Sequence, residues 1–259
     1  MFAVLKNLIF RLIQKYFVHI STDCTTSIMQ GPVLVIAPHP DDETLGCGAT
    51  IARLCEAGHK VRVVIVTDGR ASTKSSIVSP DALAAQRREE AIQAAEALGL
   101  SHEDVVFLNY RDGKTTEHIA EITRGILQQV TLFVPAIVFS PCNMDVHSDH
   151  RAIAAAIEGL QHAGRITCPV WQYPIWTGLP NWLYNVLRML LTLNNSQSCK
   201  RIEITNYLEK KQTALARYRS QLENFSSEKD WKYIKPDAIE RFQFPYELFL
   251  ERRSLNCRA

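Results

Sequence analysis

The feature that most constrains the fold is a regular alternation of short apolar runs with longer, helix-like stretches. Residues 33–37 and 61–66 form short runs rich in β-branched side chains, which is typical of strands buried on both faces of a parallel sheet. Residues 49–57 between them are helix-like and end at Gly58, a residue suited to the left-handed position after a helix. The sequence therefore predicts a strand, a helix and a second strand in this order.

The same alternation continues toward the middle of the chain. A helix is predicted over residues 81–98, because Ser79 and Pro80 suit its N-cap and its first position. The later predicted elements are strands over 105–108 and 136–140 and helices around 117–129 and 151–161. This pattern predicts an α/β fold with an open, mostly parallel sheet and helices on both faces.

The length of 259 residues suits one large α/β domain, which we favour over two small ones. Beyond about residue 169 the alternation loosens into an aromatic, proline-containing stretch. An apolar run over 182–193 and a charged helix over 207–222 are expected there. We therefore expect an amphipathic N-terminal segment (1–30) and one domain (31–259), whose last part, from about residue 169, is an α-rich elaboration.

The charge balance and the cysteine pattern indicate which partners and which cellular compartment to expect. Lys and Arg number 29 against 27 for Asp and Glu, which lacks the positive excess of nucleic-acid-binding domains. The seven cysteines are scattered and form no CxxC pair, as is typical of reduced thiols in a cytosol. Residues 1–20 contain basic side chains and neither a cleavage site nor an uncharged membrane span. We therefore expect a cytoplasmic protein that does not bind nucleic acid.

Polar residues directly follow two of the predicted strands. Residues 38–43 (PHPDDE) follow the first strand, and residues 145–150 (DVHSDH) follow the fourth. Either segment alone is compatible with a helix N-cap or a solvated turn. Because the carboxyl ends of parallel strands share one edge of a sheet, the two segments together predict a common site.

The residue types in these segments suit a hydrolytic zinc site. Such a site needs about three histidine or carboxylate ligands and one open position, and His39, Asp42 and His150 could supply the ligands. The metal lowers the pKa of its water, and a separate carboxylate must take the proton, a task that suits Asp41. His147 would protonate the departing amine, because an amide anion is a very poor leaving group.

Two further pairs of charged side chains have a spacing that suggests contact. Asp149 is expected to orient His147 and to keep it protonated. Arg87 and Glu90 have helical spacing and are expected to form an exposed ion pair.

These motifs resemble those of the LmbE/PIG-L family of zinc-dependent N-deacetylases. The resemblance is carried by residues 37–43 (APHPDDE), 46–48 (GCG) and 147–150 (HSDH). It extends from about residue 33 to 153 and, more weakly, to residues 246–249. It implies a Rossmann-like fold, which agrees with the alternation of strands and helices.

The resemblance also implies a role for each candidate residue. The family's metal ligands correspond to His39, Asp42 and His150. Its general base corresponds to Asp41, and its general acid or oxyanion stabiliser corresponds to His147, supported by Asp149.

Two residues outside the motifs resemble family residues that contact the sugar. These are Arg70, after the second predicted strand, and Asp112, after the third. One departure concerns residues 144–146 (MDV), since some family members carry a mobile tyrosine shortly before the first histidine of this motif. Help with the oxyanion would then come from the metal and His147, or from another residue.

The function implied by the resemblance is hydrolysis of an N-acetyl group on an N-acetylglucosamine-type conjugate. Family members act on N-acetylglucosamine attached to inositol, an inositol phospholipid, malate or an antibiotic aglycone, and nothing in the sequence separates these substrates. Zinc is the expected cofactor, although Fe²⁺ or another divalent ion also suits two histidines and an aspartate.

Two other classes of function are open on the sequence. A nucleotide-dependent oxidoreductase would account for Gly46, Gly48 and the later Asp68, but its glycines belong in the turn at the strand end, where residues 39–44 intervene. A non-catalytic metal- or glycan-binding module is disfavoured, because Asp41 and His147 stand beside the candidate ligands.

Two apolar helical faces raise the question of a membrane surface. The first is formed by Leu5, Leu8, Ile9, Leu12 and Ile13, and the second lies within residues 182–191. Basic amphipathic helices with interfacial aromatic residues lie on anionic membranes, which would suit a lipid-linked amino sugar at the inner face of a membrane. Packing on the domain or a homo-oligomer interface is the alternative expectation.

Overall fold

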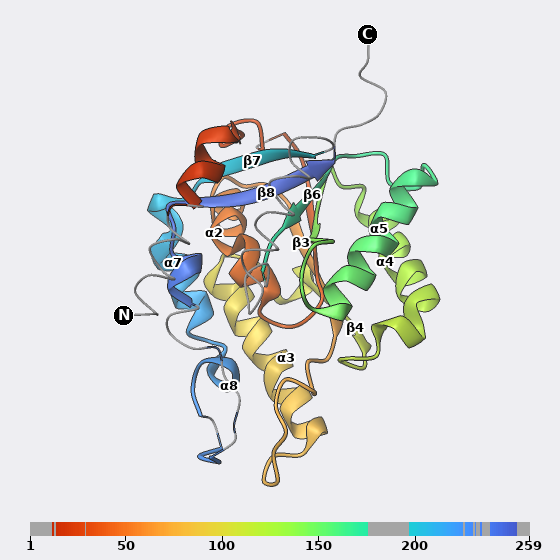
Figure 1. Ribbon diagram of the computed structural model, residues 1–259, viewed down its shortest axis with the longest axis vertical. Helices are drawn as coiled ribbons and strands as arrows, with labels where there is room; N and C mark the ends of the chain where they lie inside the picture. Colours follow the sequence, from red (N-terminus) through yellow and green to blue (C-terminus); the bar gives the residue numbers. More distant parts are fainter. Residues whose placement is uncertain are drawn as a thin grey trace.

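A mixed, mostly parallel sheet forms the centre of the computed structural model (Figure 1). The structure describes residues 12–252 except 13, 29, 176–196, 225, 230, 232–233 and 235–238. Within this part, the strands are β1 (Thr22–Asp23), β2 (Val33–Ala37), β3 (Val61–Thr67), β4 (Val105–Tyr110), β5 (Ile137–Pro141), β6 (Val170–Tyr173), β7 (Gln197–Glu203) and β8 (Tyr246–Arg252). Their order is β1-β7-β8-β6-β5-β2-β3-β4, and β8 alone runs antiparallel to its neighbours.

Helices cover both faces of this sheet (Figure 1). The described helices are α2 (Asp42–Glu56), α3 (Pro80–Ala97), α4 (Ile119–Phe133), α5 (Ser148–His162), α7 (Leu208–Leu215) and α8 (Arg219–Leu222), with short 3₁₀ turns η1 (His102–Asp104), η2 (Thr115–His118), η3 (Thr205–Tyr207) and η4 (Glu240–Phe242). Helices α2, α3 and α7 pack on one face, and α4 and α5 pack on the other.

The side chains of β2 show how the two cores are divided. Val33 and Val35 pack into the core on the side of α2, whereas Leu34 and Ile36 pack into the core on the side of α4 and α5. Every residue of β2 is buried, because the strand has a neighbour on each side and a helical layer on each face. The predicted α/β fold with helices on both faces is confirmed.

The position of β2 also determines where a ligand can bind. After β2 the chain continues into α2. Strand β2 pairs with β3 on one side and with β5 on the other, so the strand order reverses at β2. A crevice forms at such a reversal of strand order, beyond the carboxyl ends of the strands. Residues 38–41 and 142–147 leave β2 and β5 at this edge, and α2 and α5 begin there.

The part of the chain beyond residue 169 differs in detail from the sequence prediction. It supplies not only helices but also β6, which pairs with β5, and β7 and β8, which extend the sheet beyond β6. The helix expected over 207–222 is divided into η3, α7 and α8. It is interrupted before α8 at Tyr218, which has a ψ of 57° and turns its side chain into the core.

The N-terminal segment packs on the domain where the structure describes it. Residues 14–20 are helical, and Phe17 is buried against Cys142, Met144 and Leu250. The exposed residues of this segment include Leu12 and Tyr16. Residues 1–11 and the apolar run 182–193 lie outside the described residues, so both membrane faces stay predictions.

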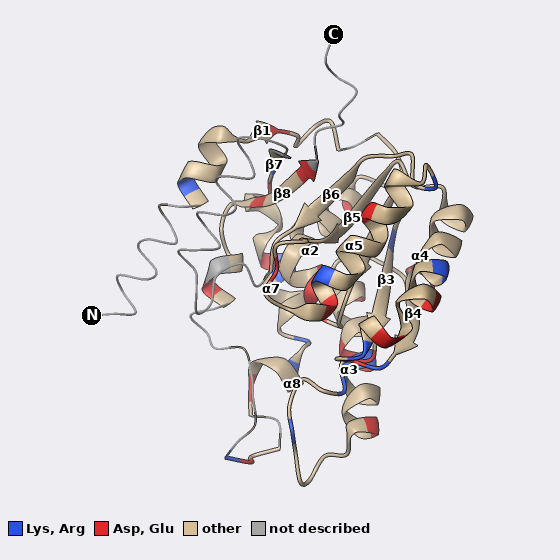
Figure 2. Cartoon of the chain, turned by 45° about the vertical axis from the view of Figure 1, so that its right-hand side comes forward, with Lys and Arg blue, Asp and Glu red and all other residues tan. Residues whose placement is uncertain are grey.

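In the described part of the chain, the charged residues are not segregated by sign, and no helix is of the membrane-spanning kind. Among the described residues, basic and acidic positions are interspersed along the chain (Figure 2). None of the described helices combines the length and apolar character needed to cross a membrane.

Candidate metal centre and catalytic site

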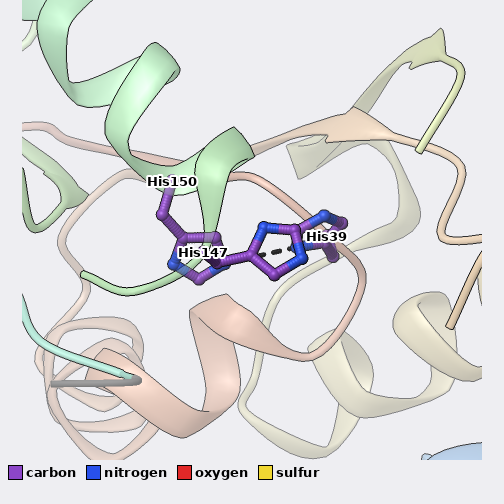
Figure 3. Close-up of side chains that lie close together, drawn as sticks. All are labelled: His39, His147 and His150. Carbon is purple, nitrogen blue, oxygen red and sulfur yellow. Dashed lines mark hydrogen bonds between the residues drawn. The ribbon is translucent and has the colours of Figure 1, made fainter. Parts of the chain in front are cut away.

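Three side chains from two segments of the chain meet at the carboxyl edge of the sheet. His39 follows β2, Asp42 begins α2, and His150 lies in the first turn of α5; all three are buried. The Asp42 Oδ2 atom lies 3.1 Å from both His39 Nδ1 and His150 Nε2, and these two nitrogens are 3.3 Å apart. Figure 3 shows the two imidazoles joined by this contact, with His147 beside them.

His39 Nδ1, Asp42 Oδ2 and His150 Nε2 form a triangle, and the distances between these three atoms match a tetrahedral metal site. Zinc lies about 2.0–2.1 Å from histidine nitrogen and carboxylate oxygen, so tetrahedral geometry places two such ligands about 3.3 Å apart. The three atoms of His39, Asp42 and His150 therefore need little movement to bind one ion. The predicted ligand set is brought together by the fold.

The second nitrogen of each histidine contacts a carboxylate. His39 Nε2 lies 3.1 Å from Asp112 Oδ1 and 3.2 Å from Asp149 Oδ2. His150 Nδ1 lies 3.1 Å from Asp145 Oδ2. A ring that donates one N–H to a carboxylate directs the lone pair of its other nitrogen at the metal, as is usual for metal-binding histidines.

These carboxylates also favour the protonated rings in the absence of metal. Burial disfavours a charged His150, but Asp42 and Asp145 outweigh this effect and raise its pKa to about 9. The pKa of His39 is raised for the same kind of reason, by Asp112, Asp149 and Asp42, against its burial. A metal must therefore displace protons from both rings.

In the part of the chain that the structure describes, two other groups of three side chains lie close enough to hold an ion. They are His39 with His147 and His150, and His39 with Asp112 and Asp149. We prefer the group that contains Asp42, because all three of its atom pairs are within 3.3 Å. In the group with Asp112 and Asp149, the His39 nitrogen is already placed to donate to both carboxylates.

Asp41 is a buried carboxylate held in an unusual backbone conformation. Its φ of 121° lies in a region that side-chain-bearing residues rarely adopt. Its Oδ2 atom accepts a hydrogen bond of 3.0 Å from Arg87 Nη2. Burial raises the pKa of Asp41 to about 8, although the positive charge of Arg87 opposes this. A carboxylate with a pKa near neutrality can both accept and return a proton.

The prediction of an exposed ion pair between Arg87 and Glu90 is wrong. Both side chains are buried, and Arg87 also donates to the carbonyl oxygens of Gly69 and Pro40. Glu90 instead accepts from the backbone N–H and the hydroxyl of Ser220, at 2.9 and 2.6 Å. Arg87 is covered by the residues of the site, and Glu90 is covered where α3 packs on α7 and α8.

His147 stands at the N-cap of α5, half-buried beside the two histidines of the triangle. Its ring centroid lies 4.7 Å from that of His39 and 5.1 Å from that of His150 (Figure 3). Burial lowers its pKa, and the charges of His39 and His150 add to this effect. Its Nδ1 accepts a 3.3 Å hydrogen bond from the backbone N–H of Asp149, which places the proton of a neutral ring on Nε2.

The carboxylate of Asp149 contacts other groups than the sequence suggested. It lies against His39 and accepts from Thr115 Oγ1 at 2.8 Å and from the N–H of Gly113 at 2.9 Å. Only its backbone N–H reaches His147. Asp149 therefore orients His147 through the main chain, while its negative charge partly offsets the lowered pKa of that ring.

The two candidate sugar contacts differ in how close they lie to the triangle. Asp112 is buried beside His39, and its Oδ2 accepts a 3.0 Å hydrogen bond from the N–H of Ala71. Arg70 is bound to Asp68 at 2.6 Å and to Asp81 at 2.7 Å. Arg70 also lines two open cavities of about 190 and 260 Å³.

Several residues of the site were not identified from the sequence. Asp145 was noted only as part of its segment, although a carboxylate five residues before a candidate ligand is a usable signal. Arg87 has the appearance of an ordinary helix surface charge. Glu43 was noted only as a member of its motif, and Tyr218, which donates to it, lies far away in the sequence.

Comparison with known proteins gives a consistent assignment. Residues 34–160 match the PIG-L family model, described as GlcNAc-PI de-N-acetylase. Diacetylchitobiose deacetylase of Thermococcus kodakarensis is 35% identical over 136 residues, which cover 51% of this chain and 50% of that protein. A probable N-acetyl-α-D-glucosaminyl L-malate deacetylase 2 of Bacillus cereus is 33% identical over 139 residues, which cover 50% of this chain and 60% of that protein. The chain thus spans about half the length of such curated relatives.

A solved structure extends the comparison to most of the chain. N,N'-diacetylchitobiose deacetylase from Pyrococcus horikoshii has a TM-score of 0.53 and 30% sequence identity. The likeness covers 74% of this chain and 71% of that one. The family model matches, the fold is shared, and the motif residues lie together at one edge of the sheet. The chain therefore belongs to the PIG-L (LmbE-like) family.

Proposed function

We propose that this protein is a metal-dependent N-deacetylase that removes an acetyl group from an N-acetylglucosamine-type conjugate. The observation that carries the proposal is the triangle of His39, Asp42 and His150, with ligand atoms 3.1–3.3 Å apart beside the buried carboxylate of Asp41. The names of the relatives, which include diacetylchitobiose and glucosaminyl-malate deacetylases, support the class of substrate.

His39, Asp42 and His150 would hold the ion, which we propose to be zinc, with Fe²⁺ as an alternative occupant. A metal at this position would polarise the acyl carbonyl and lower the pKa of water. The carboxylates of Asp112, Asp149 and Asp145 fix the two rings from behind, so that the ligand atoms are in place before binding.

Asp41 is the proposed general base. Its carboxylate takes a proton from the attacking water and, once protonated, returns that proton to the nitrogen of the departing amine. Its pKa, which burial raises to about 8, suits both directions of transfer near neutral pH. Arg87 holds the carboxylate in place through the 3.0 Å hydrogen bond.

His147 is proposed to stabilise the oxyanion. Its Nδ1 is occupied by the N–H of Asp149, so the neutral ring presents an Nε2–H that can donate to the developing negative charge. Of the two roles implied for His147, its lowered pKa favours donation from the neutral ring over proton transfer from a charged ring. Protonation of the amine then falls to Asp41.

The substrate sugar is proposed to lie between the triangle and Arg70. Asp112 contacts both His39 and the N–H of Ala71, and Ala71 lines the larger of the two cavities next to Arg70. The remainder of the conjugate would extend from the metal centre toward that cavity. A lipid-linked conjugate is one member of this substrate class, and contact with a membrane surface or a second copy of the chain stays a prediction.

A release assay tests this proposal directly. The zinc-loaded protein is incubated with N-acetylglucosamine linked to a second sugar, to inositol or to malate, and free acetate is measured. We expect acetate from at least one conjugate, and loss of the activity after chelation with recovery on adding zinc. Binding of zinc and of a conjugate without acetate release would contradict the proposal and would indicate a non-catalytic binding module.

A further inference from the structure

Glu43, next to the proposed base and ligand, is held by a residue from the C-terminal part of the chain. Tyr218, between α7 and α8, donates its hydroxyl hydrogen bond to Glu43 Oε1. The side chains are both buried, with 1% of Tyr218 and 2% of Glu43 exposed. This contact joins segments 175 residues apart in the sequence.

Glu43 in turn fixes the backbone of Asp41. Its Oε2 accepts a 3.1 Å hydrogen bond from the Asp41 N–H, while Oε1 also accepts a 2.5 Å hydrogen bond from Thr44 Oγ1. Asp41 needs such support because of its φ of 121°. A backbone in this region persists only where surrounding contacts hold it.

The first turn of α2 cannot rely on the rest of its helix for this support. The helix is interrupted at Cys47, which has a φ of −146° and a ψ of 21°. At the interruption, Lys211 Nζ donates to the carbonyl oxygen of Leu45 at 2.8 Å. Glu247 accepts from the N–H groups of Ala49 and Thr50 at 3.1 and 2.8 Å. The turn that carries Asp42 and Glu43 is therefore supported from outside its helix. The support comes from Tyr218 through Glu43, from Lys211 of α7 at Leu45 and from Arg87 of α3 at Asp41.

We propose that Tyr218 is a positioning residue for the general base: through Glu43 it holds the backbone of Asp41 in the conformation that directs its carboxylate into the site. The role rests on the proposed function, in which Asp41 moves the proton. Tyr218 lies outside residues 34–160, so the matched family region would depend on the C-terminal part of this chain for its catalytic geometry.

The test replaces Tyr218 by Phe, which keeps the buried ring and removes only the hydroxyl. We expect kcat to fall about tenfold with KM within about twofold, because a small misplacement of a catalytic group lowers the rate of the chemical step more than substrate binding. Zinc stoichiometry should stay unchanged. In hydrogen-exchange measurements made without substrate, the Asp41 amide should exchange at least about threefold faster than in the wild type.

Tyr173→Phe is the matched control. Tyr173 is equally buried, and its hydroxyl donates to the carbonyl oxygen of Ile36 at 2.6 Å instead of to Glu43. This variant should lose a comparable amount of thermal stability while its kcat and the exchange of the Asp41 amide stay at the wild-type level. If Tyr218→Phe does not fold, Glu43→Gln replaces it, since the amide keeps the side-chain volume but cannot accept equally from Tyr218 and Asp41.

The outcomes separate this inference from the proposed function. Wild-type kcat in the Tyr218 variant, or a lower kcat with unchanged exchange at Asp41, would overturn the positioning role. An equal loss of kcat in the Tyr173 variant would also overturn it. Failure of the wild-type protein to release acetate from any conjugate would instead contradict the proposed function. In that case the exchange rate of the Asp41 amide would still show whether Tyr218 controls the Asp41 backbone.

Discussion

Removal of the Lys211 charge should destabilise the protein far more than removal of the neighbouring Lys210 charge. Lys211 is 2% exposed and pairs with Glu247, which is 4% exposed, at 2.6 Å. Lys211→Met leaves the Glu247 carboxylate buried without its counter-ion and the carbonyl oxygen of Leu45 without its donor. Breaking one side of a buried pair costs about 3–5 kcal/mol.

That cost can be expressed as a shift in thermal unfolding. For a domain of this size, 1 kcal/mol corresponds to about 2–4 °C in Tm, so Lys211→Met should lower Tm by about 6–20 °C. Lys210 pairs with Glu56 on the surface, where both side chains are about half exposed. Because exposed pairs contribute little, Lys210→Met should leave Tm near the wild-type value.

Thermal unfolding followed by circular dichroism, with urea denaturation to obtain free energies, compares the two variants under the same conditions. A second comparison adds Glu247→Gln to Lys211→Met, which should recover part of the loss because the uncompensated charge is removed. Equal shifts for Lys210→Met and Lys211→Met would refute this prediction, since the expected difference in Tm arises from burial of the Lys211 pair and not from the loss of a lysine.

Further predictions concern the metal, its pH dependence, the sugar contact and the membrane. His39→Ala and His150→Ala should each lose bound metal by elemental analysis, and full occupancy in both would contradict the ligand assignment. Because the metal-free pKa of His150 is raised to about 9, zinc affinity measured by competition should rise with pH up to about 9 and weaken below it as the ring keeps its proton. Arg70→Ala should raise KM by about tenfold with little change in kcat, and an unchanged KM would remove Arg70 from the sugar site. Flotation with anionic vesicles should show binding that is reduced by deleting residues 1–17, and no binding would exclude the N-terminal face as an anchor.

The alternating pattern was enough to predict the sheet because its central strands are buried on both faces, whereas the edge strand β4 is only partly buried. Residues 33–37 coincide with β2, and the predicted strand over 105–108 lies within β4. By contrast, the described side chains of β7 are a mixture of partly buried polar residues and buried apolar ones, and the strand pairs antiparallel with a distant strand, so no local run of apolar residues indicates it. The pattern beyond residue 169 therefore suggested helices alone.

The candidate site shows the same limit. His39, Asp42 and His150 could be predicted because ligand-type side chains directly follow two buried strands whose ends must meet. Arg87 and Tyr218 could not, because their partners are decided by which surfaces α3 and the segment before α8 cover in the folded protein. A charge on a helix and a tyrosine in a polar stretch are compatible with an exposed position until the tertiary packing is known.

In the proposed mechanism, Asp41 moves the proton beside a metal held by His39, Asp42 and His150. The most direct test is acetate release by zinc-loaded Asp41→Asn, measured with zinc content on the same sample. The amide is nearly the same size as the carboxylate but cannot take the proton, so we predict full zinc content and a kcat lowered by about 10²-fold or more. Near-wild-type turnover in the zinc-loaded variant across the pH range would contradict the account.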